Sequence, residues 1–460
     1  MAMRSHAMFL VATALAALPC AAAAAADRQA ELEARLRMLE EAVAGLRAEL
    51  EAARAGAGAG AATASASEGA RTAAEEDVAR LEARLAAQEA REGFRVGGTT
   101  FRAGGFVKLW SAYSVYGDGA PAPGALVRDF YLPQQIPVGG ARSTGFAAHA
   151  KQTRLWISGT ADAGGHPITG YVEVDFQTAP GTQGTARTTN GYNLAVRRAT
   201  IAWRGFAAGQ DWSTFQNVGA LPETTDFIGP TEGTVFVRQP LIRWTGKIGT
   251  SANIALAVEN PVTSSITTQS VALKESDDAA FPDLVARLSG RIGQAELSLA
   301  GIAHDVSAND GATKDSAFGW GLSLAGRVPF GAGRRHDLRF MLTGGEGIGH
   351  YVGLNFAPDG VFADGRVHPV GLVAGFAALR IGWSARMRST LMGSFQEVDY
   401  PDVALPAAAN RSAWSIAGNI FASPLRGLDL GLELRHGQRE ILSGDTGSLD
   451  RVEFITRYTF

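Results

Sequence analysis

Arginine is the residue type with the clearest chemical use in this sequence. Lysine occurs only at positions 108, 151, 247, 274 and 314, so arginine carries nearly all of the positive charge. Several basic residues stand in short alternating segments, opposite apolar neighbours. A guanidinium binds a carboxylate or phosphate through two parallel hydrogen bonds, so a row of such residues predicts anion recognition. The candidates are Lys108, Arg154, Arg198, Arg204, Arg238 and Arg243.

The same basic residues allow a second interpretation. Acidic residues such as Glu173 and Asp175 alternate with apolar residues in a neighbouring segment. If the acids and arginines share one face, they can pair and simply brace a protein wall. The sequence leaves recognition and bracing equally open.

One long connection is rich in residues that could form a functional loop. The segment Asn217 to Gly233 contains Pro222, Glu223 and Asp226 and follows a segment that ends in Asp211-Trp212. If it folds inward, Glu223 and Asp226 lie at a constriction. The alternative is a solvated external loop.

Motifs for enzyme chemistry are missing. The sequence has no G-x-S-x-G, H-E-x-x-H, P-loop or dinucleotide-binding glycine pattern. The histidines after His6 show no metal-ligand spacing, and Cys20 is the only cysteine. We therefore predict no catalytic residues, no metal and no cofactor. An outer-membrane hydrolase is the least favoured function, because nothing marks a nucleophile.

Residues 94–460 have the pattern of membrane-spanning strands. Apolar and polar residues alternate in segments of about ten residues, the length that crosses a bilayer at a tilt. Only a closed barrel pairs the backbone of a spanning sheet, so we predict an all-β transmembrane antiparallel barrel of about sixteen strands. Sixteen strands are wide enough for an aqueous channel. The predicted starts lie near Phe106, Ala150, Ile168, Leu194, Phe206, Thr234, Ser251, Asp283, Gln294, Ser316, Asp337, Pro369, Met387, Arg411, Gly427 and Arg451.

The last strand ends in aromatic residues, Tyr458-Thr459-Phe460. A terminal Phe460 on such a strand looks like the signal that outer-membrane assembly machinery recognises. The expected surroundings are outer-membrane lipid and lipopolysaccharide. Residues 94–460 hold 32 basic and 31 acidic residues, and this balance gives no reason to expect nucleic acid.

The first 26 residues are predicted to be a signal peptide. Arg4 precedes an apolar run from Phe9 to Pro19, and an alanine run follows it. Cys20 raises a lipoprotein alternative, but Pro19 fits a lipobox poorly. Export would place the mature protein in the envelope of a Gram-negative bacterium.

Between the signal and the barrel the sequence predicts helices. Residues 27–54 show a heptad seam, which favours a coiled coil in the periplasm; a lone amphipathic helix is the alternative. Residues 55–72 form a Gly/Ala/Ser linker, and 73–92 a second short helix. The seam residues are Leu32, Leu36, Leu39, Val43, Leu46 and Leu50.

Three sequence blocks resemble the DcaP-like family of outer-membrane porins. They are 105–109 (GFVKL), 151–155 (KQTRL) and, most densely, 208–243 with its AGQDWSTF and ALPETTDF stretches. The resemblance covers nearly the whole mature chain and is strongest over 101–245. Two departures stand out: Trp110 where an acidic residue is expected, and Lys151 where Arg is common.

The resemblance implies a homotrimer of sixteen-stranded barrels that takes up small anionic molecules, notably dicarboxylic acids. We therefore expect a porin for passive diffusion of small hydrophilic solutes, biased to organic anions. Two alternatives remain: a phosphate-selective porin, which a lysine cluster would favour, and a structural barrel that tethers the envelope through its coiled coil.

Overall fold

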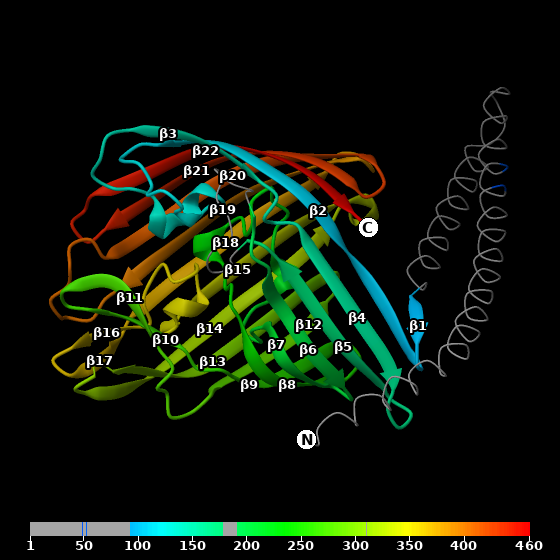
Figure 1. The fold of residues 1–460 in the computed structure, drawn as a ribbon, viewed down its shortest axis with the longest axis horizontal. Coiled ribbons are helices and arrows are strands. Elements are labelled where there is room, and N and C mark those ends of the chain that lie inside the picture. Colours follow the sequence, from blue (N-terminus) through cyan, green and yellow to red (C-terminus); the bar gives the residue numbers. More distant parts are fainter. Residues whose placement is uncertain (1–47, 49–51, 53–92, 178–190, 310) are drawn as a thin grey trace, which may run out of the picture. The chain divides into compact units, whose positions relative to one another are not determined.

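The computed structural model describes residues 48, 52, 93–177, 191–309 and 311–460. The predicted signal peptide, coiled coil, linker and second helix lie outside these residues, apart from Ala48 and Ala52. In the described part, one antiparallel sheet closes on itself. Its first long strand, β2 (Thr99–Tyr116), pairs along eleven positions with the last, β22 (Thr446–Thr459), beside which it lies in Figure 1.

The sheet contains 18 strands, which occupy sixteen positions in the barrel. β1 (Phe94–Val96) only forms a hairpin with the start of β2, and β3 and β4 are two parts of one position, since both pair with β2. The prediction of sixteen strands is confirmed. The strand predicted near Ala150 is interrupted there, because 150–153 leave the ladder between its halves.

Strands of opposite direction alternate around the barrel. Those running parallel to β2 are β5 (Pro167–Asp175), β7 (Phe206–Trp212), β9 (Ala252–Glu259), β13 (Ala295–Asn309), β15 (His336–Glu346), β19 (Met387–Asp399) and β21 (Leu428–Ile441). Those running against it are β3 (Ser143–His149), β4 (Arg154–Asp162), β6 (Ala195–Trp203), β8 (Arg238–Ile248), β12 (Asp283–Ile292), β14 (Lys314–Phe330), β18 (Gly371–Gly382), β20 (Asn410–Leu425) and β22.

The two ends of the barrel differ in their connections. Short turns join the strands at one end, which also holds the chain's last residue. At the other end most connections are long loops, and only β13–β14 and β21–β22 are joined by short turns. In outer-membrane barrels the short turns face the periplasm and the long loops face outward. Two of the long loops, 260–282 and 347–370, build a second sheet of β10 (Thr263–Thr267), β11 (Ser270–Ser276), β16 (Gly360–Ala363) and β17 (Arg366–Pro369). This small sheet was not predicted.

Short 3-10 helices lie between the strands. They are η2 (Leu126–Arg128), η3 (Pro133–Gln135), η4 (Val218–Ala220), η5 (Thr231–Gly233), η6 (Ala332–Arg334) and η7 (Gly349–Tyr351). Among the described residues, no helix is long and apolar enough to cross a membrane.

Alternation of residue type gives the barrel two faces. On β22, Val452 and Phe454 are both 43% exposed, whereas Arg451 and Glu453 are at most 2% exposed. Outward apolar and inward polar side chains are what a lipid-facing barrel with a polar interior requires. Exposed aromatic residues lie toward both ends of the strands, as in interfacial girdles: Trp203, Phe206, Trp244, Phe330, Trp383 and Tyr458 near the short turns, and Phe146, Phe318, Trp320, Phe395 and Trp414 near the long loops.

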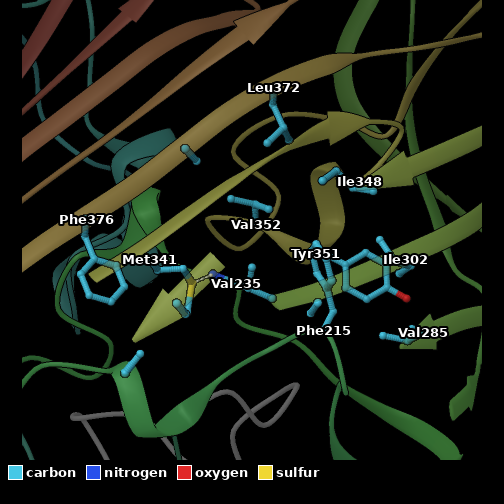
Figure 2. Close-up of a cluster of buried hydrophobic side chains, with 14 of the residues drawn as sticks. Phe215, Val235, Val285, Ile302, Met341, Ile348, Tyr351, Val352, Leu372 and Phe376 are labelled. Carbon is cyan, nitrogen blue, oxygen red and sulfur yellow. Dashed lines mark hydrogen bonds between the residues drawn. The ribbon is translucent and has the colours of Figure 1, made fainter. Parts of the chain in front are cut away.

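The barrel interior also contains an apolar core. Figure 2 shows Phe215 and Val235, from the connection after β7, packed with Tyr351 and Val352, from the loop after β15. Inward residues of the wall, such as Met341, complete the cluster. Two loops therefore fold into the barrel and pack on each other there.

Candidate functional site: an arginine-rich lumen crossed by an inner loop

Residues 213–237, the inner loop, connect β7 to β8 through the barrel interior. Near its start, Asn217 donates a 2.7 Å hydrogen bond to Ser298 on β13. Further along, Thr225 donates a 2.8 Å hydrogen bond to Glu453 on β22. Because β13 and β22 are distant positions of the barrel wall, the loop crosses the lumen. Of the two alternatives for residues 217–233, a loop inside the barrel or a solvated external loop, the structure has the first.

The inner loop packs tightly against the wall. A Cβ at Gly233 would lie 2.2 Å from the carbonyl oxygen of Gly375 on β18, so only glycine fits this approach. The Val235 N–H donates to the Met341 sulfur at 3.3 Å, drawn as a dashed line in Figure 2. Val235 also pairs with Val352 in an isolated β-bridge. The loop is thus held by main-chain contacts as well as side chains.

Lys108 faces the interior, as expected, but lies under the inner loop. It is 6% exposed, and its ammonium group donates to the Thr225 carbonyl at 2.7 Å and to Gln152 Oε1 at 2.5 Å. The inner loop therefore covers the Lys108 charge, and anion binding by Lys108 stays a prediction from the sequence. Its place in the structure is to hold the loop to β2.

Asp226 has a similar local role. It is 3% exposed, and its carboxylate accepts hydrogen bonds from the main-chain N–H groups of Tyr131, Ile228 and Gly229, at 2.8, 3.1 and 3.1 Å. These bonds shape the turn of the inner loop and tie it to the loop after β2. Asp226 lies inside the barrel, but its oxygens are already engaged.

Glu223 is the inner-loop carboxylate that meets the charged wall. Arg388 on β19 donates to both of its oxygens, from Nε at 2.7 Å and from Nη2 at 2.6 Å. Arg380 on β18 and Arg457 on β22 approach the same carboxylate at 3.6 and 3.9 Å. Glu223 therefore connects three strands of the wall.

Asp337 on β15 is a second carboxylate shared by several arginines. Its oxygens lie 2.7 Å from Arg339 Nε, 3.1 Å from Arg327 Nη2 and 3.8 Å from Arg380 Nη1. Arg380 thus links the ion pairs of Asp337 to those of Glu223. A third carboxylate, Asp429 on β21, continues the chain by binding Arg388 and Arg457 at 3.0 and 2.7 Å.

These residues form one connected arginine band, with Glu223 on the inner loop and the others near the short-turn ends of six strands. The band has five guanidinium groups and three carboxylates, so its formal charge is +2. Its arginine side chains keep between 16% and 33% of their surface exposed, whereas Asp337 is fully buried. The positive groups of the band are therefore more open to solvent than the shared Asp337. The arginines are Arg327, Arg339, Arg380, Arg388 and Arg457, and the acids Glu223, Asp337 and Asp429.

Arg154, one of the candidates from the sequence, belongs to a separate group on β4 to β6. It lies 3.9 Å from Glu173 and 3.8 Å from Asp175. The same two acids bind Arg197 more closely, at 2.8 and 2.5 Å. A β-bulge between the ladders of β5 and β6 turns both Arg197 and its neighbour Arg198 inward.

Arg198 and Arg243 share Asp211. Both guanidinium groups lie 2.5 Å from its carboxylate, and Arg198 stands over the Tyr171 ring at 4.7 Å. Two arginines against one acid again leave positive charge in excess. The side chains are 29% and 18% exposed.

The last two candidates differ from expectation. Arg204 is not on a strand face: it lies in the tight turn between β6 and β7 with φ of 49°, and it is exposed. The alternating pattern simply continued one residue past the end of β6. Arg238 begins β8 and stands over the Trp212 ring at 5.1 Å. Strict alternation along β8 would point Arg238 and Arg243 to different faces of the sheet. Both side chains are nevertheless partly buried.

Sequence reasoning missed the arginine band and Arg197. The band residues follow the same alternation as those that were named; on β22, for example, Arg457 shares the inward face with Arg451 and Glu453. That signal could have found them. The bulge that brings Arg197 inward has no comparable signal in the alternating pattern.

The fold and the lumen define an outer-membrane channel. A family model described as DcaP outer membrane protein matches residues 135–460. The chain belongs to this family, as the resemblance implied. Family members are porins, channel proteins rather than enzymes.

A solved structure has the same fold. The outer membrane channel DcaP of Acinetobacter baumannii is 21% identical with a TM-score of 0.65; the match covers 80% of this chain and 99% of that one. A loop-deletion variant of OmpT from Vibrio cholerae (10% identity, TM-score 0.49, covering 79% and 100%) and OmpF of Salmonella typhi (9%, 0.48, covering 80% and 100%) are more distant. Among curated proteins, none matches this chain.

Proposed function

We propose that this channel passes small hydrophilic solutes and favours organic anions such as dicarboxylates. The observation that carries the proposal is the arginine band, in which five guanidinium groups face three carboxylates. Arginine excess in a narrow, partly desolvated lumen lowers the energy of an anion there. Pairing and recognition thus operate together: the acids brace the wall, and the surplus arginines attract the solute.

The bond between Glu223 and Arg388 shows the geometry available to a solute. A carboxylate of the protein binds that guanidinium through two hydrogen bonds. A dicarboxylate can offer two such groups, one to each of two arginines. The side chains of Arg327, Arg457 and Arg380, which are 33%, 26% and 25% exposed, are the most open in the band.

The test is conductance of the protein in planar bilayers. With a salt gradient, the reversal potential should show preference for chloride over potassium, and succinate should block the current in a dose-dependent way. A double variant, Arg327→Gln with Arg380→Gln, should lose both effects, while Arg411→Gln, an exposed residue at the other end of the barrel, should keep them. Cation preference in the unaltered protein would refute the proposal, and stronger block by phosphate than by succinate would favour phosphate selectivity instead.

We also propose that the chain acts as a homotrimer. Strands β5, β6, β7 and β9 have only 7 to 9 residues and β8, between β7 and β9, has 11, whereas β14 and β20 have 17 and 16. At about 3.3 Å per residue and a tilt of about 45°, 7 to 9 residues cover about 16–21 Å, less than the apolar band of about 25 Å. Such a wall, with Val196 and Ile201 exposed on it, suits a protein neighbour better than lipid.

The oligomeric state can be read by electrophoresis. The unheated protein in mild detergent should migrate at about three times the mass of the boiled chain, and Ile201→Arg on the short wall should dissociate it. Substitution of Leu322, an exposed residue on the long strand β14, by arginine should leave the trimer intact. A monomer in the unaltered protein would contradict the proposal. The periplasmic helix and the role of Phe460 in assembly stay proposals that rest on the sequence.

A further inference from the structure

Three buried side chains meet at the long-loop end of the barrel, outside the arginine band. His304 lies on β13, His350 on η7, and Asp359 directly before β16. One ligand atom from each lies within 4.8 Å of the others, close enough to surround one metal ion. No two of these residues are near each other in sequence except His350 and Asp359, so no spacing motif marks them.

The His304 ring is held in one orientation and has a free nitrogen. Its Nδ1 lies 2.6 Å from Asp283 Oδ1. Its Nε2 is buried and has no hydrogen-bond partner among the described residues, and its side chain is 0% exposed. A buried polar atom without a partner destabilises the folded protein. A metal ion is one partner that would satisfy this nitrogen.

The His350 ring contacts the third residue of the group, Asp359, directly. Its Nδ1 lies 3.1 and 3.2 Å from the two oxygens of Asp359, and its Nε2 is also buried without a partner among the described residues. The rings of His304 and His350 are 5.4 Å apart between centroids. Two imidazoles, each with an unpaired nitrogen, therefore converge on one carboxylate.

The carboxylate is fixed by the main chain. Asp359 Oδ2 accepts a hydrogen bond from the Ser264 N–H at 2.6 Å, and Oδ1 accepts one from the His350 N–H at 2.9 Å. Ser264 belongs to β10, so the small external sheet holds the third ligand in place. Rigid placement of this kind is what a preformed metal site requires.

We propose that His304, His350 and Asp359 bind Zn²⁺. Two imidazole nitrogens and one carboxylate oxygen match the ligands zinc takes, with a fourth position left for water or another donor. His304 would bind through Nε2, and Asp283 on its Nδ1 supplies the outer carboxylate that orients metal-bound histidines. Asp283 also accepts a hydrogen bond from the Tyr351 hydroxyl, which fixes it in turn.

A metal here would fasten two parts of the lumen together. His350 and Asp359 belong to the loop after β15, and His304 to the wall. The same loop pairs with the inner loop through Val352 and Val235, and the Tyr351 carbonyl accepts from the Phe236 N–H at 2.9 Å. Zinc would thus stiffen the support of the inner loop from outside the arginine band.

The experiment measures zinc bound to the full, untagged protein in detergent after removal of metals with EDTA. Elemental analysis after equilibration with micromolar zinc should give one Zn²⁺ per chain, and zinc should raise the Tm. His304→Gln and His350→Gln should each lower the affinity at least tenfold. His368→Gln, in β17 of the same loop, is the matched control and should bind as the unaltered protein does.

A second, more conservative variant is needed if the histidine variants do not fold. Folding is judged by the change in electrophoretic mobility on heating. Asp283→Asn keeps all three ligands and removes the outer carboxylate, so it should weaken zinc binding about 10–100-fold. The proposal is overturned if the unaltered protein holds no zinc at micromolar concentration. It is equally overturned if folded His304→Gln or Asp283→Asn binds zinc with unchanged affinity.

Discussion

The Glu223 carboxylate accepts two hydrogen bonds from Arg388, from Nε at 2.7 Å and from Nη2 at 2.6 Å. This pair joins the inner loop to the barrel wall at the arginine band. It also removes one negative charge from contact with a passing solute and occupies one arginine. The balance between loop attachment and solute attraction therefore depends on this single carboxylate.

Glu223→Gln should increase anion preference. The substitution raises the formal charge of the arginine band from +2 to +3. A unit charge at about 10 Å in water contributes about 0.4 kcal/mol, which favours chloride and disfavours potassium by about twofold each, so the chloride-to-potassium permeability ratio should rise about fourfold. Reversal potentials in a salt gradient give this ratio. Glu440→Gln, in an exposed pair with Arg411, should leave it unchanged, and a fall for Glu223→Gln would contradict the assignment.

Two substitutions at Asp337 and Arg327 should act in opposite directions. Asp337→Asn removes the carboxylate that three arginines share, and should raise the chloride preference. Arg327→Gln removes the most exposed arginine of the band and should lower it. The same bilayer measurement compares both variants with the unaltered channel. Shifts of the same sign would show that the band does not control selectivity.

Lys108→Met should loosen the inner loop. Lys108 is 6% exposed, and removal of its ammonium group leaves the Thr225 carbonyl and Gln152 without their donor. The expected loss in stability is about 1–3 kcal/mol, with larger fluctuations of the open-channel current. Denaturant titration and single-channel recording measure these effects. Lys247→Met, at an exposed position on β8, should change neither the stability nor the current fluctuations. Unchanged stability and unchanged current fluctuations in Lys108→Met would disprove the anchoring role.

Glu232 should make stability depend on pH. Burial within the inner loop raises the pKa of Glu232 above its ordinary value of 4.5, and one of its oxygens accepts from the Tyr131 hydroxyl at 3.4 Å. Because the folded pKa is the higher one, the stability that Glu232 contributes is complete below pH 4.5 and is lost as pH rises through the folded value. The Tm of Glu232→Gln, relative to the unaltered protein, should therefore increase from pH 4.5 upward. A difference that is constant with pH would contradict this.

Phe460→Ala should impair assembly more than stability. The main chain of Phe460 exchanges two 3.1 Å hydrogen bonds with Gly105 at the barrel seam, and these bonds do not need the ring. The ring itself is 58% exposed. We expect a several-fold lower amount of folded protein in outer membranes, with an unchanged Tm for the fraction that folds. Phe454→Ala, at an outward position on the same strand, is the control. Normal assembly of Phe460→Ala would show that Phe460 is not an assembly signal.

Much of the fold was predictable because strand alternation is a local property. Residues such as Val452 and Phe454 mark a lipid face by type alone, and sixteen strand positions follow from counting such segments. The inward arginines were predictable in the same way, one strand at a time. Arg204 shows where this fails: a pattern of residue types does not report the residue at which a strand turns.

Pairing across strands was not predictable. Whether an arginine meets an acid depends on strand register, on a bulge such as the one before Arg198, and on the path of the inner loop. Lys108 was correctly placed on the inward face of β2, but only the folded loop covers it. Glu223 was named as a loop residue, and its three arginine neighbours come from strands more than 150 residues away.

The sequence by itself determined an alternating barrel of sixteen strands and inward faces rich in arginine, because these follow from local composition and period. The tertiary structure alone decided which charges neutralise each other and which stay in excess. It also brought His304 and His350 together, where their spacing in the chain indicated no metal site. The physical reason is that barrel closure and loop packing determine which residues lie next to a charge or an imidazole. Both bring together residues that are far apart in the sequence.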